Sequence, residues 1–322
     1  MTPRDDLDRA ADLRTESGVI DRLRAASGTR VVVVRDGRLR VQSDAVLRVA
    51  VDTVGDAEWA LLGRDLDGTE LLLAAVPAET DSFDAAPEET WLGLRDTGGR
   101  LSAHETELFV SAVALAAWLV EARHCAACGA RLQLMQAGWS RHCPDCRREH
   151  FPRTDPAVIV AVESPDGEKL LLGANASWRG RMYSCFAGFV EAGEALETTV
   201  HREIAEEAGV TLASLHYIGS QPWPYPRSLM IGFRAVAADE HAVPDGEEII
   251  DVRWLTRDEI GRALAGDGPV GLPGESSIAR RLIVDWYENR GVLSERSESK
   301  CGVLSERSES KCGVLSERSE SK

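Results

Sequence analysis

The chain has 322 residues, of which 43% are hydrophobic, and its formal net charge is −16. A chain of this length is expected to form two domains of ordinary size with true hydrophobic cores. The acidic balance argues against a surface that binds nucleic acid through many nonspecific phosphate contacts, but it leaves room for a local basic pocket. Because the N-terminal stretch MTPRDDLDRAADLR has no apolar segment, we expect neither a secretory signal nor a membrane partner, and a cytoplasmic location.

Residues 1–120 are expected to form a small α+β domain. Short apolar runs flank Asp36-Gly37, a pair that is typical of hairpin turns. The apolar runs predict strands at residues 31–34, 39–41, 46–51 and 71–76.

A helix is expected at residues 103–122, where apolar positions recur with helical spacing. Ser102 and Glu105 have the spacing of a capping box at its start. The apolar run at 109–120 is too short to span a bilayer, so we expect a buried helix.

Four cysteines form two CxxC pairs separated by fourteen residues, a spacing typical of tetrahedral zinc. Four thiolates leave no open position for water, so we expect one structural Zn2+ per chain, in a ribbon at 121–152. Reduced core cysteines or a redox motif are the alternative interpretation. Arg141, Arg147 and Arg148 lie nearby and are more typical of a solvated face than of a nucleic-acid patch. The expected zinc ligands are Cys125, Cys128, Cys143 and Cys146.

Acidic residues stand at set spacings in the stretch GFVEAGEALETTVHREIAEEAGV, from Gly188 to Val210. From about residue 195 the pattern predicts a helix, and Gly209 stands where a left-handed cap is expected. Glu203, Glu206 and Glu207 are then expected on one helix face, where they repel one another unless a cation or basic partner intervenes. Divalent ions such as Mg2+ and Mn2+ prefer carboxylate oxygens.

This stretch resembles the Nudix box, G-x5-E-x7-R-E-U-x-E-E-x-G-U with U aliphatic, and every fixed position is filled. A solvated acidic face is the ordinary interpretation of such runs, but a complete match to a long pattern favours chemistry. The resemblance implies a metal-dependent hydrolase of nucleoside diphosphates linked to another group. It implies that Glu203 and Glu207 bind metal and that Glu206 is a ligand or the base that takes a proton from water. Arg202 would orient the carboxylates by salt bridging.

Residues 153–290 are expected to form a mixed sheet flanked by helices, the α/β/α sandwich that the Nudix resemblance also implies. A closing helix is expected at about 277–287. The strands are predicted at residues 157–162, 169–173, 183–189, 215–218, 228–235 and 254–255.

Three prolines alternate with aromatic residues in the run SQPWPYPRS, at residues 220–228. Prolines fix φ and exclude helix, so we expect a stiff extended loop that carries Trp223 and Tyr225. The run resembles the SQPWPFPxS signature of the NADH pyrophosphatase branch of Nudix hydrolases. Tyr225 replaces the usual Phe, a change that keeps the ring and is expected to matter little. The four-cysteine ribbon and the segment FPRTDPAVI after it belong to the same resemblance.

This resemblance covers about residues 90–285 and implies further site residues. Glu248, six residues before a tryptophan, would join the metal site, as would the carbonyl of Ala187. The family can place a Glu where this chain has Gly138, so that contact is not carried over. Two phenylalanines would sandwich a planar base. The implied substrate-binding residues, these two included, are Arg95, Phe151, Phe189, Gln221, Pro222, Trp223, Pro224, Tyr225, Pro226, Arg227, Ser228 and Ala279.

An eleven-residue unit, GVLSERSESKC, is repeated in the C-terminal stretch 291–322, and the third copy lacks the final Cys. An eleven-residue period can mark a supercoiled helix, but each unit has too few apolar residues to bury. We therefore expect disorder there and no designed role for Cys301 and Cys312.

Together these patterns predict a Mg2+ or Mn2+ dependent NAD+ diphosphatase that releases AMP and nicotinamide mononucleotide, with zinc in a structural role. Removal of NAD caps from RNA 5′ ends is a second enzymatic interpretation. A zinc-ribbon regulator on an inactive Nudix scaffold is an alternative of another class, which the intact glutamate set disfavours. A homodimer is implied by the resemblance only. The ranking of NADH, NAD+, other dinucleotides and capped RNA depends on pocket shape and stays open.

Overall fold

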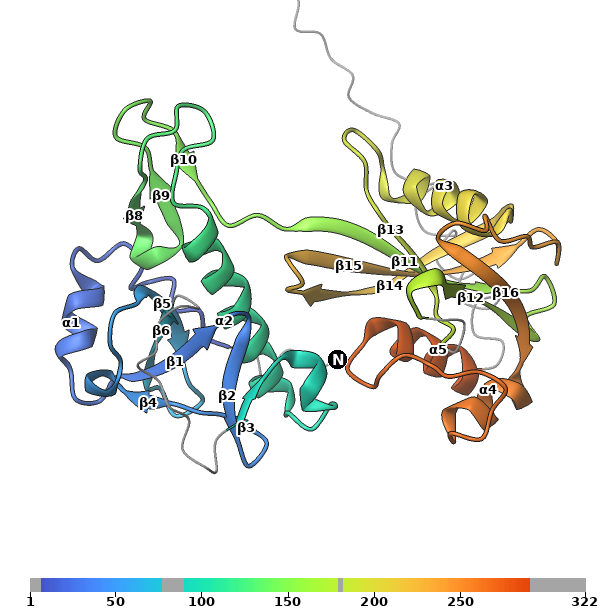
Figure 1. Cartoon of the computed structure of the whole chain (residues 1–322), viewed down its shortest axis with the longest axis horizontal. Helices are drawn as coiled ribbons and strands as arrows, with labels where there is room; N and C mark the ends of the chain where they lie inside the picture. The colour runs from blue at the N-terminus through green and yellow to red at the C-terminus, as the bar shows by residue number, and fades with distance from the viewer. Residues whose placement is uncertain (1–6, 77–89, 179–181, 290–322) are drawn as a thin grey trace, which may run out of the picture.

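The structure is a computed structural model that describes residues 7–76, 90–178 and 182–289. Figure 1 shows an N-terminal lobe, a small ribbon that rises from it, and a C-terminal lobe reached through an extended segment. The repeated stretch 291–322, with Cys301 and Cys312, lies outside the described residues.

The N-terminal lobe is a seven-stranded sheet with a helix on each face. Val32 and Val34 of β1 pack in the cluster that contains helix α2 (Ala103–Glu121), whereas Val31 and Val33 pack in the cluster of α1 (Val19–Ala25). Alternate side chains thus enter opposite cores, as the two-residue period of a strand requires. The strands are β1 (Arg30–Arg35), β2 (Arg38–Gln42), β3 (Ala45–Val46), β4 (Val49–Ala50), β5 (Glu58–Arg64), β6 (Glu70–Val76) and β7 (Thr90–Leu92).

The predicted hairpin at Asp36-Gly37 is confirmed, since Arg35 pairs with Arg38 across the turn. The single strand predicted at 46–51 is wrong, because this segment divides into β3, β4 and a 3-10 turn at Val51–Thr53. Strand β5 was not predicted.

Helix α2 begins at a capping residue, as expected, but only half of the capping box forms. Ser102 Oγ accepts a hydrogen bond from Glu105 N at 3.2 Å. The Glu105 carboxylate instead accepts from Val46 N at 2.7 Å and from Arg48 at 2.7 Å, because these donors lie across the lobe core. Within the described residues, α2 is the one helix whose length and apolar composition would allow it to cross a membrane, and half of that window is buried.

The ribbon is a three-stranded antiparallel sheet of β8 (Gln133–Met135), β9 (Ser140–His142) and β10 (Glu149–His150). A 3-10 turn, η3 (Gln136–Gly138), sits against strand β5. A Cβ atom at Gly138 would lie 2.4 Å from Ala60 Cβ, so this contact admits only glycine. The ribbon is therefore held closely on the N-terminal lobe.

The C-terminal lobe is a mixed six-stranded sheet in the order β14-β15-β11-β12-β16, with β13 paired to β11. Strand β11 runs parallel to β15 and antiparallel to β12 and β13. The strands are β11 (Asp155–Glu163), β12 (Lys169–Asn175), β13 (Phe186–Phe189), β14 (Leu212–Trp223), β15 (Ser228–Ala237) and β16 (Ile249–Thr256).

Helices cover both faces of this sheet, which confirms the predicted α/β/α sandwich (Figure 1). Val158 and Val160 of β11 pack in the cluster of α3 (Leu196–Ala208), and Ile159 packs in the cluster of α4 (Arg257–Leu264) and α5 (Ile278–Glu288). Helix α4 was not predicted, although Thr256 and Glu259 form a complete capping box before it.

The proline-rich run is only in part the stiff extended loop that was expected. Strand β14 continues through Gln221 to Trp223, which pairs with Ser228 at the end of a β14–β15 hairpin. The tip of this hairpin reaches the N-terminal lobe, where Trp223 and Tyr225 pack against the α2 core cluster. Two regions far apart in the sequence are therefore joined at this tip.

Candidate active site

Helix α3 presents the glutamates of the Nudix-like stretch. Leu196, Val200 and Ile204 lie in the core between α3 and the sheet, so the helix is anchored by its apolar stripe. Gly209 ends the helix with φ 65°, in the left-handed region that favours glycine. The C-terminal end of the carboxylate-bearing helix is thus determined by local sequence.

Arg202 joins the acidic side chains of this helix. Its Nε and Nη2 each contact a Glu194 oxygen at 2.9 Å, and its Nη1 contacts Glu203 at 2.8 Å and Glu206 at 3.0 Å. Arg202 Nη2 also donates to the Phe189 carbonyl of β13 at 3.0 Å. Hydrogen bonding to Arg202 lowers the pKa of Glu194 to about 2, so Glu194 stays ionised and holds the guanidinium.

Two of the three helix glutamates are buried against the sheet. The side chains of Glu203 and Glu207 are 12% and 5% exposed, whereas that of Glu206 is 60% exposed. Glu203 and Glu206 lie on one side of the helix, as expected, because both contact Arg202 Nη1, but Glu206 is the more exposed of the two. A Cβ atom on Gly188 would lie 1.9 Å from Glu203 Cδ, so the Glu203 carboxylate occupies space that only glycine leaves free.

Glu207 is the most perturbed carboxyl of the cluster. Burial, followed by the negative charges of Glu248, Glu203 and Asp245, raises its pKa to about 8. Its Oε2 is buried and has no hydrogen-bond partner among the described residues. A buried, unpartnered carboxylate oxygen among like charges suits a divalent cation. The cation offsets both the cost of burying the unpaired charge and the repulsion between the neighbouring carboxylates.

Glu248 reaches this cluster from the start of β16, some forty residues after the helix. Asn175 Nδ2 donates to Glu248 Oε1 at 3.3 Å. Asp245 accepts from the backbone N–H groups of Glu247 and Ile249 at 3.0 and 2.9 Å, which holds the turn before Glu248. Asn175 and Asp245 were not predicted, although the Asp245-Gly246 pair is a turn signal.

Ala187, the other predicted metal-site residue, lies on β13 next to Gly188 and pairs with Ile159. Its position on the strand beneath α3 places its backbone close to the glutamate cluster. In the described chain, however, only the four cysteines bring three or more candidate ligand atoms within 4.8 Å of one another. The carboxylates interact electrostatically, and their mutual repulsion opposes closer approach.

The predicted dinucleotide residues fall into a connected group and a scattered group. In the connected group, Arg95 of the 3-10 turn η2 (Leu94–Thr97) lies 5.2 Å from the Trp223 ring and 5.4 Å from the Tyr225 ring. These two rings meet edge to face at 5.5 Å. The Tyr225 hydroxyl accepts a hydrogen bond from Leu94 N at 2.8 Å, a contact that the usual Phe could not make.

Gln221 lies on the same hairpin and faces the loop before α5. Its Nε2 donates to the Ser276 carbonyl at 2.8 Å. Its Oε1 is buried and has no hydrogen-bond partner within the described part of the chain. This acceptor is free for an N–H or O–H group of a ligand.

The remaining predicted residues are not brought to one place. Phe151 and Phe189 are both exposed, and no ring contact joins them in the residues that the structure describes. Arg227 forms an ion pair with Asp155 at 3.0 Å. The other predicted residues belong to the sheet, the hairpin tip or helix α5. Pro222 pairs with Leu229, Ser228 pairs with Asp155, Pro224 and Pro226 form the hairpin tip, and Ala279 is buried in α5.

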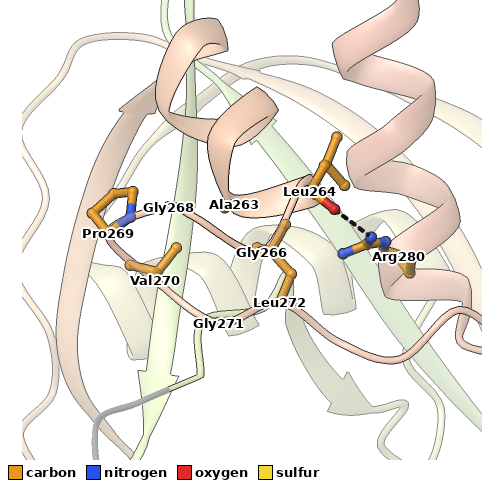
Figure 2. Close-up of a pocket in the computed structure, with 9 residues that line it drawn as sticks. All are labelled: Ala263, Leu264, Gly266, Gly268, Pro269, Val270, Gly271, Leu272 and Arg280. Atoms are coloured by element: carbon orange, nitrogen blue, oxygen red, sulfur yellow. Dashed lines mark hydrogen bonds between the residues drawn. The ribbon is translucent and has the colours of Figure 1, made fainter.

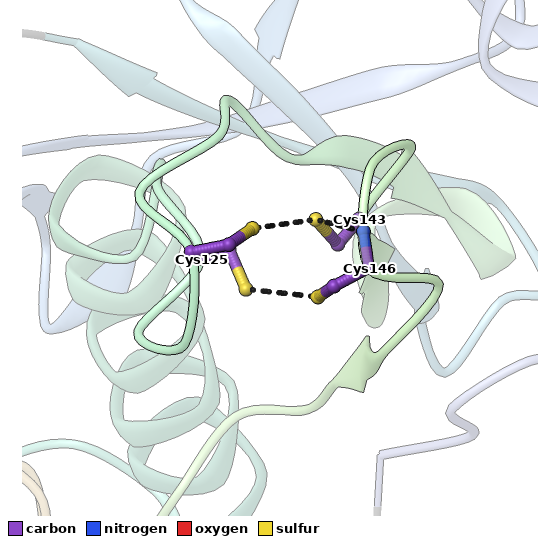
Figure 3. A group of neighbouring side chains, drawn as sticks. Cys125, Cys143 and Cys146 are labelled. Atoms are coloured by element: carbon purple, nitrogen blue, oxygen red, sulfur yellow. Dashed lines mark hydrogen bonds between the residues drawn. The ribbon is translucent and has the colours of Figure 1, made fainter.

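The four cysteine sulfurs form a tight group (Figure 3). Cys125 Sγ lies 3.6 Å from Cys146 Sγ, and Cys128 Sγ lies 3.5 Å from Cys143 Sγ. Sulfurs bound to one zinc at about 2.3 Å stand roughly 3.8 Å apart, so this group fits the ion with little movement. Backbone N–H groups, that of Ala127 first, lower the pKa of Cys125, which favours the thiolate that zinc requires.

A cavity of about 570 Å³ between α4 and the loop before α5 contains none of the predicted site residues (Figure 2). Its lining is mostly glycine and aliphatic residues, and the Arg280 guanidinium donates to the Leu264 carbonyl at 3.5 Å. Without a carboxylate, thiol or imidazole in the lining, it offers no group that could catalyse hydrolysis.

Comparison with known proteins agrees with this geometry. Residues 153–271 match the NUDIX domain model, and residues 121–151 match the NADH pyrophosphatase zinc ribbon domain model. The NAD-capped RNA hydrolase NudC of Mycobacterium bovis (strain BCG / Pasteur 1173P2) is 40% identical over 274 residues, which cover 82% of this chain and 85% of that protein.

Two further relatives are more distant. The NAD-capped RNA hydrolase NudC of Stutzerimonas stutzeri (strain A1501) is 36% identical and covers 67% of this chain and 73% of that protein. The NAD-capped RNA hydrolase NUDT12 of Homo sapiens is 36% identical and covers 58% of this chain and 43% of that protein.

The sandwich lobe with its glutamate helix defines a hydrolase of the Nudix class, and the zinc ribbon identifies the branch of that class. The chain belongs to the NADH pyrophosphatase family of Nudix hydrolases. It is therefore an enzyme that hydrolyses diphosphate bonds of the NAD type, and its four cysteines form a zinc ribbon.

Proposed function

We propose that the chain uses Mg2+ or Mn2+ to hydrolyse the diphosphate of NADH or NAD+, and that it releases AMP and reduced or oxidised nicotinamide mononucleotide. The observation that carries the proposal is the buried, unpartnered Oε2 of Glu207, surrounded by Glu203, Glu248 and Asp245. Such an oxygen suits a divalent ion, and diphosphate oxygens supply the remaining ligands that Mg2+ prefers.

In this proposal Glu203, Glu207, Glu248 and the carbonyl of Ala187 hold the metal. The chemistry that a divalent ion supplies there is neutralisation of the diphosphate charge and acidification of the attacking water. The water oxygen forms a new bond to phosphorus, the bridging P–O bond breaks, and the departing phosphate keeps the bridging oxygen. Glu206, exposed and tied to Arg202 at 3.0 Å, is either a further ligand or the base that takes the proton from water.

The hairpin tip and Gln221 are proposed to hold the nucleotide. Gln221 Oε1 would accept a hydrogen bond from the ligand, since its amide nitrogen is already engaged with Ser276. Arg95 stacks on both aromatic rings of the tip, so it would offer a fixed positive charge to a phosphate group of a nucleotide bound there. Phe151 and Phe189 are exposed and available to stack on a planar base.

The assembly and domain division belong to the same proposal. We propose an N-terminal domain at 1–120, a zinc ribbon at 121–152, the hydrolase domain at 153–290 and a C-terminal tail at 291–322. A homodimer and a cytoplasmic location complete it. Zinc is proposed to stabilise the ribbon and to take no part in hydrolysis, because four sulfurs fill its coordination sphere.

A second candidate substrate is RNA that carries an NAD cap. The M. bovis and S. stutzeri relatives are NAD-capped RNA hydrolases, which favours this substrate, and the bond to be cleaved is the same diphosphate. A zinc-ribbon regulator without catalysis is disfavoured, since a binding module has no need for a repulsive buried glutamate cluster.

Product analysis by chromatography tests the proposal. NADH, NAD+, ADP-ribose and NAD-capped RNA would each be incubated with Mg2+, Mn2+ or no divalent ion. We expect AMP and nicotinamide mononucleotide to form only when a divalent ion is present. Glu207→Gln should abolish their formation, and Glu197→Gln, a substitution at an exposed position of the same helix, should leave it unchanged. Absence of cleavage of every substrate under every condition would refute the enzymatic proposal and favour the regulator.

A further inference from the structure

A second cavity, of about 200 Å³, lies where the ribbon meets the N-terminal lobe. Three guanidinium groups line it against one carboxylate, in a protein whose net charge is −16. The overall composition does not predict such a local excess of positive charge. The lining residues are Glu58, Arg123, Arg131, Leu132, Leu134 and Arg141.

Arg141 is only 2% exposed, so the expectation that it belongs to a solvated face is wrong. Its Nη1 and Nη2 donate to the Ala122 and Leu119 carbonyls at 2.6 and 2.7 Å, at the C-terminal end of α2. Its Nε is buried without a hydrogen-bond partner among the described residues.

A second arginine nitrogen in the same cavity also makes no hydrogen bond within the described chain. Arg123 Nε is buried and forms an ion pair with Glu58 at 3.5 Å, a distance beyond that of a good hydrogen bond. A buried donor without an acceptor costs about 1–3 kcal/mol, and more when the group is charged. Two such cationic donors in one cavity favour an acceptor that carries negative charge.

We propose that this cavity binds a phosphate group, with Arg123 and Arg141 as donors and the exposed Arg131 at its rim. Guanidinium groups are suited to phosphate because their N–H groups match its oxygens in spacing and charge. Leu134 is partly exposed beside the arginines and offers apolar surface to a ribose or base. The site lies on the ribbon and N-terminal lobe, apart from the glutamates of α3.

The phosphate can belong to the backbone of an RNA chain or to a free nucleotide or inorganic phosphate. The backbone of a capped RNA is the source we favour, a choice that rests on the capped-RNA form of the proposed function. A local basic cavity is compatible with the acidic surface, since one phosphate contact does not require an extended basic patch.

Another explanation of the arginines is that they offset the negative charge of zinc bound to four thiolates. Arg123 and Arg141 each precede a zinc-ribbon cysteine by two residues. In that case their removal would weaken zinc retention and leave phosphate binding unchanged. Zinc content therefore has to be measured beside ligand binding.

The test compares the full-length, zinc-loaded protein with an Arg123→Gln/Arg131→Gln double variant. Arg141 is left intact because it holds the end of α2, and Arg148→Gln, an exposed change on the ribbon, is the matched control. Binding of a short 3′-labelled, NAD-capped RNA is followed by fluorescence anisotropy without Mg2+ or Mn2+, with inorganic phosphate and AMP as competitors. Zinc content and NADH turnover are measured on the same samples.

We expect the double variant to bind the RNA about tenfold more weakly and to lose about 0.7 from the slope of log affinity against log salt, as for one phosphate contact. The control, the zinc content and NADH turnover should not change. Phosphate competition that is lost in the variant, while its RNA affinity is unchanged, would support the site with a free anion as its source. The proposal would be overturned if the double variant bound both phosphate and RNA as tightly as the unaltered protein. It would also be overturned if the variant lost zinc while its phosphate and RNA binding stayed unchanged. Absence of NADH turnover in the unaltered protein would contradict the proposed function only, because binding is read separately.

Discussion

Glu207 is the residue on which the metal site depends most, because it is buried, unpartnered and surrounded by other carboxylates. Arg202 forms ion pairs with Glu203, Glu206 and Glu194 but, among the described residues, none with Glu207. The carboxylate of Glu207 thus lacks the positively charged neighbour that Glu203 and Glu206 have in Arg202.

Replacing Glu207 with Gln should abolish most activity and stabilise the protein in the absence of Mg2+. We expect kcat to fall at least about 100-fold, because the amide binds a divalent ion poorly. At pH 8 to 9 the free energy of unfolding should rise by roughly 1–3 kcal/mol, because a buried charge is removed. Steady-state kinetics and urea unfolding measure both effects, and Glu197→Gln should show neither.

The raised pKa of Glu207 also predicts how stability depends on pH. A carboxyl whose pKa rises from 4.5 to about 8 on folding contributes most stability below pH 4.5 and loses it as the pH rises through 8. Without Mg2+, the unfolding free energy should therefore decline between these values, and added Mg2+ should stabilise more at pH 9 than at pH 5. Thermal unfolding of the unaltered, zinc-loaded protein from pH 5 to 9 measures this dependence. A stability that did not change with pH in the absence of Mg2+ would contradict the prediction.

Gly188→Ala tests whether the Glu203 carboxylate needs the space beside β13. The new Cβ would lie within 2.3 Å of both Glu203 oxygens, so the carboxylate must move away from the metal site. We expect turnover to fall about tenfold to a hundredfold while unfolding stays cooperative. Gly28→Ala, where nothing lies within 4 Å of the new atom, is the matched control for kinetics and circular dichroism.

The β14–β15 hairpin is the element that joins the two lobes. Its base lies in the hydrolase sheet, and its tip packs on the core beneath α2. Arg95, Trp223 and Tyr225 form one stack, so a residue of the N-terminal lobe contributes to the predicted nucleotide site. The hydroxyl of Tyr225, which sequence comparison treated as minor, makes a specific contact there.

Tyr225→Phe should loosen this tip without touching the glutamates. Loss of the hydrogen bond from Leu94 N leaves a buried donor unpaired and costs about 1 kcal/mol. We expect KM for NADH to rise about fivefold with kcat nearly unchanged. Tyr217→Phe, at an exposed ring, is the control, and an unaltered KM in Tyr225→Phe would show that the hydroxyl does not position the hairpin.

In the whole molecule the ribbon is fastened to the N-terminal lobe by a few specific contacts. Trp139 Nε1 donates to the Leu61 carbonyl at 2.7 Å, Gly138 lies against Ala60, and Arg141 holds the end of α2. The ribbon itself buries few apolar side chains, namely Cys125, Leu132 and Cys143 with Ala130 beside them. So small a core needs the metal to stay folded.

Removing zinc should therefore unfold the ribbon and lower the stability of the N-terminal lobe that it contacts. We expect differential scanning calorimetry of zinc-depleted protein to show a lower first transition that Zn2+ restores and Mg2+ does not. A melting profile that is the same with and without bound zinc would contradict a structural role for the ion.

Much of the fold was readable from local patterns. The hairpin at Asp36-Gly37, the capped start of α2 and the continuously apolar strands β11 and β12 depend on neighbouring residues and were predicted. The proline-rich run was taken for a loop because proline disfavours strands, yet its edge position in the sheet tolerates it.

The residues of the candidate site also divide into those that local sequence patterns identified and those that only the folded chain brings together. Spacing along one helix and between two CxxC pairs identified the glutamates and cysteines, because a helical turn and a zinc knuckle are both local structures. Sequence spacing did not indicate Asn175 and Asp245 beside Glu248, or the stacking of Arg95 on the hairpin tip. Such groupings arise when distant segments pack, so burial, unpartnered donors and the raised pKa of Glu207 appear only in the folded chain.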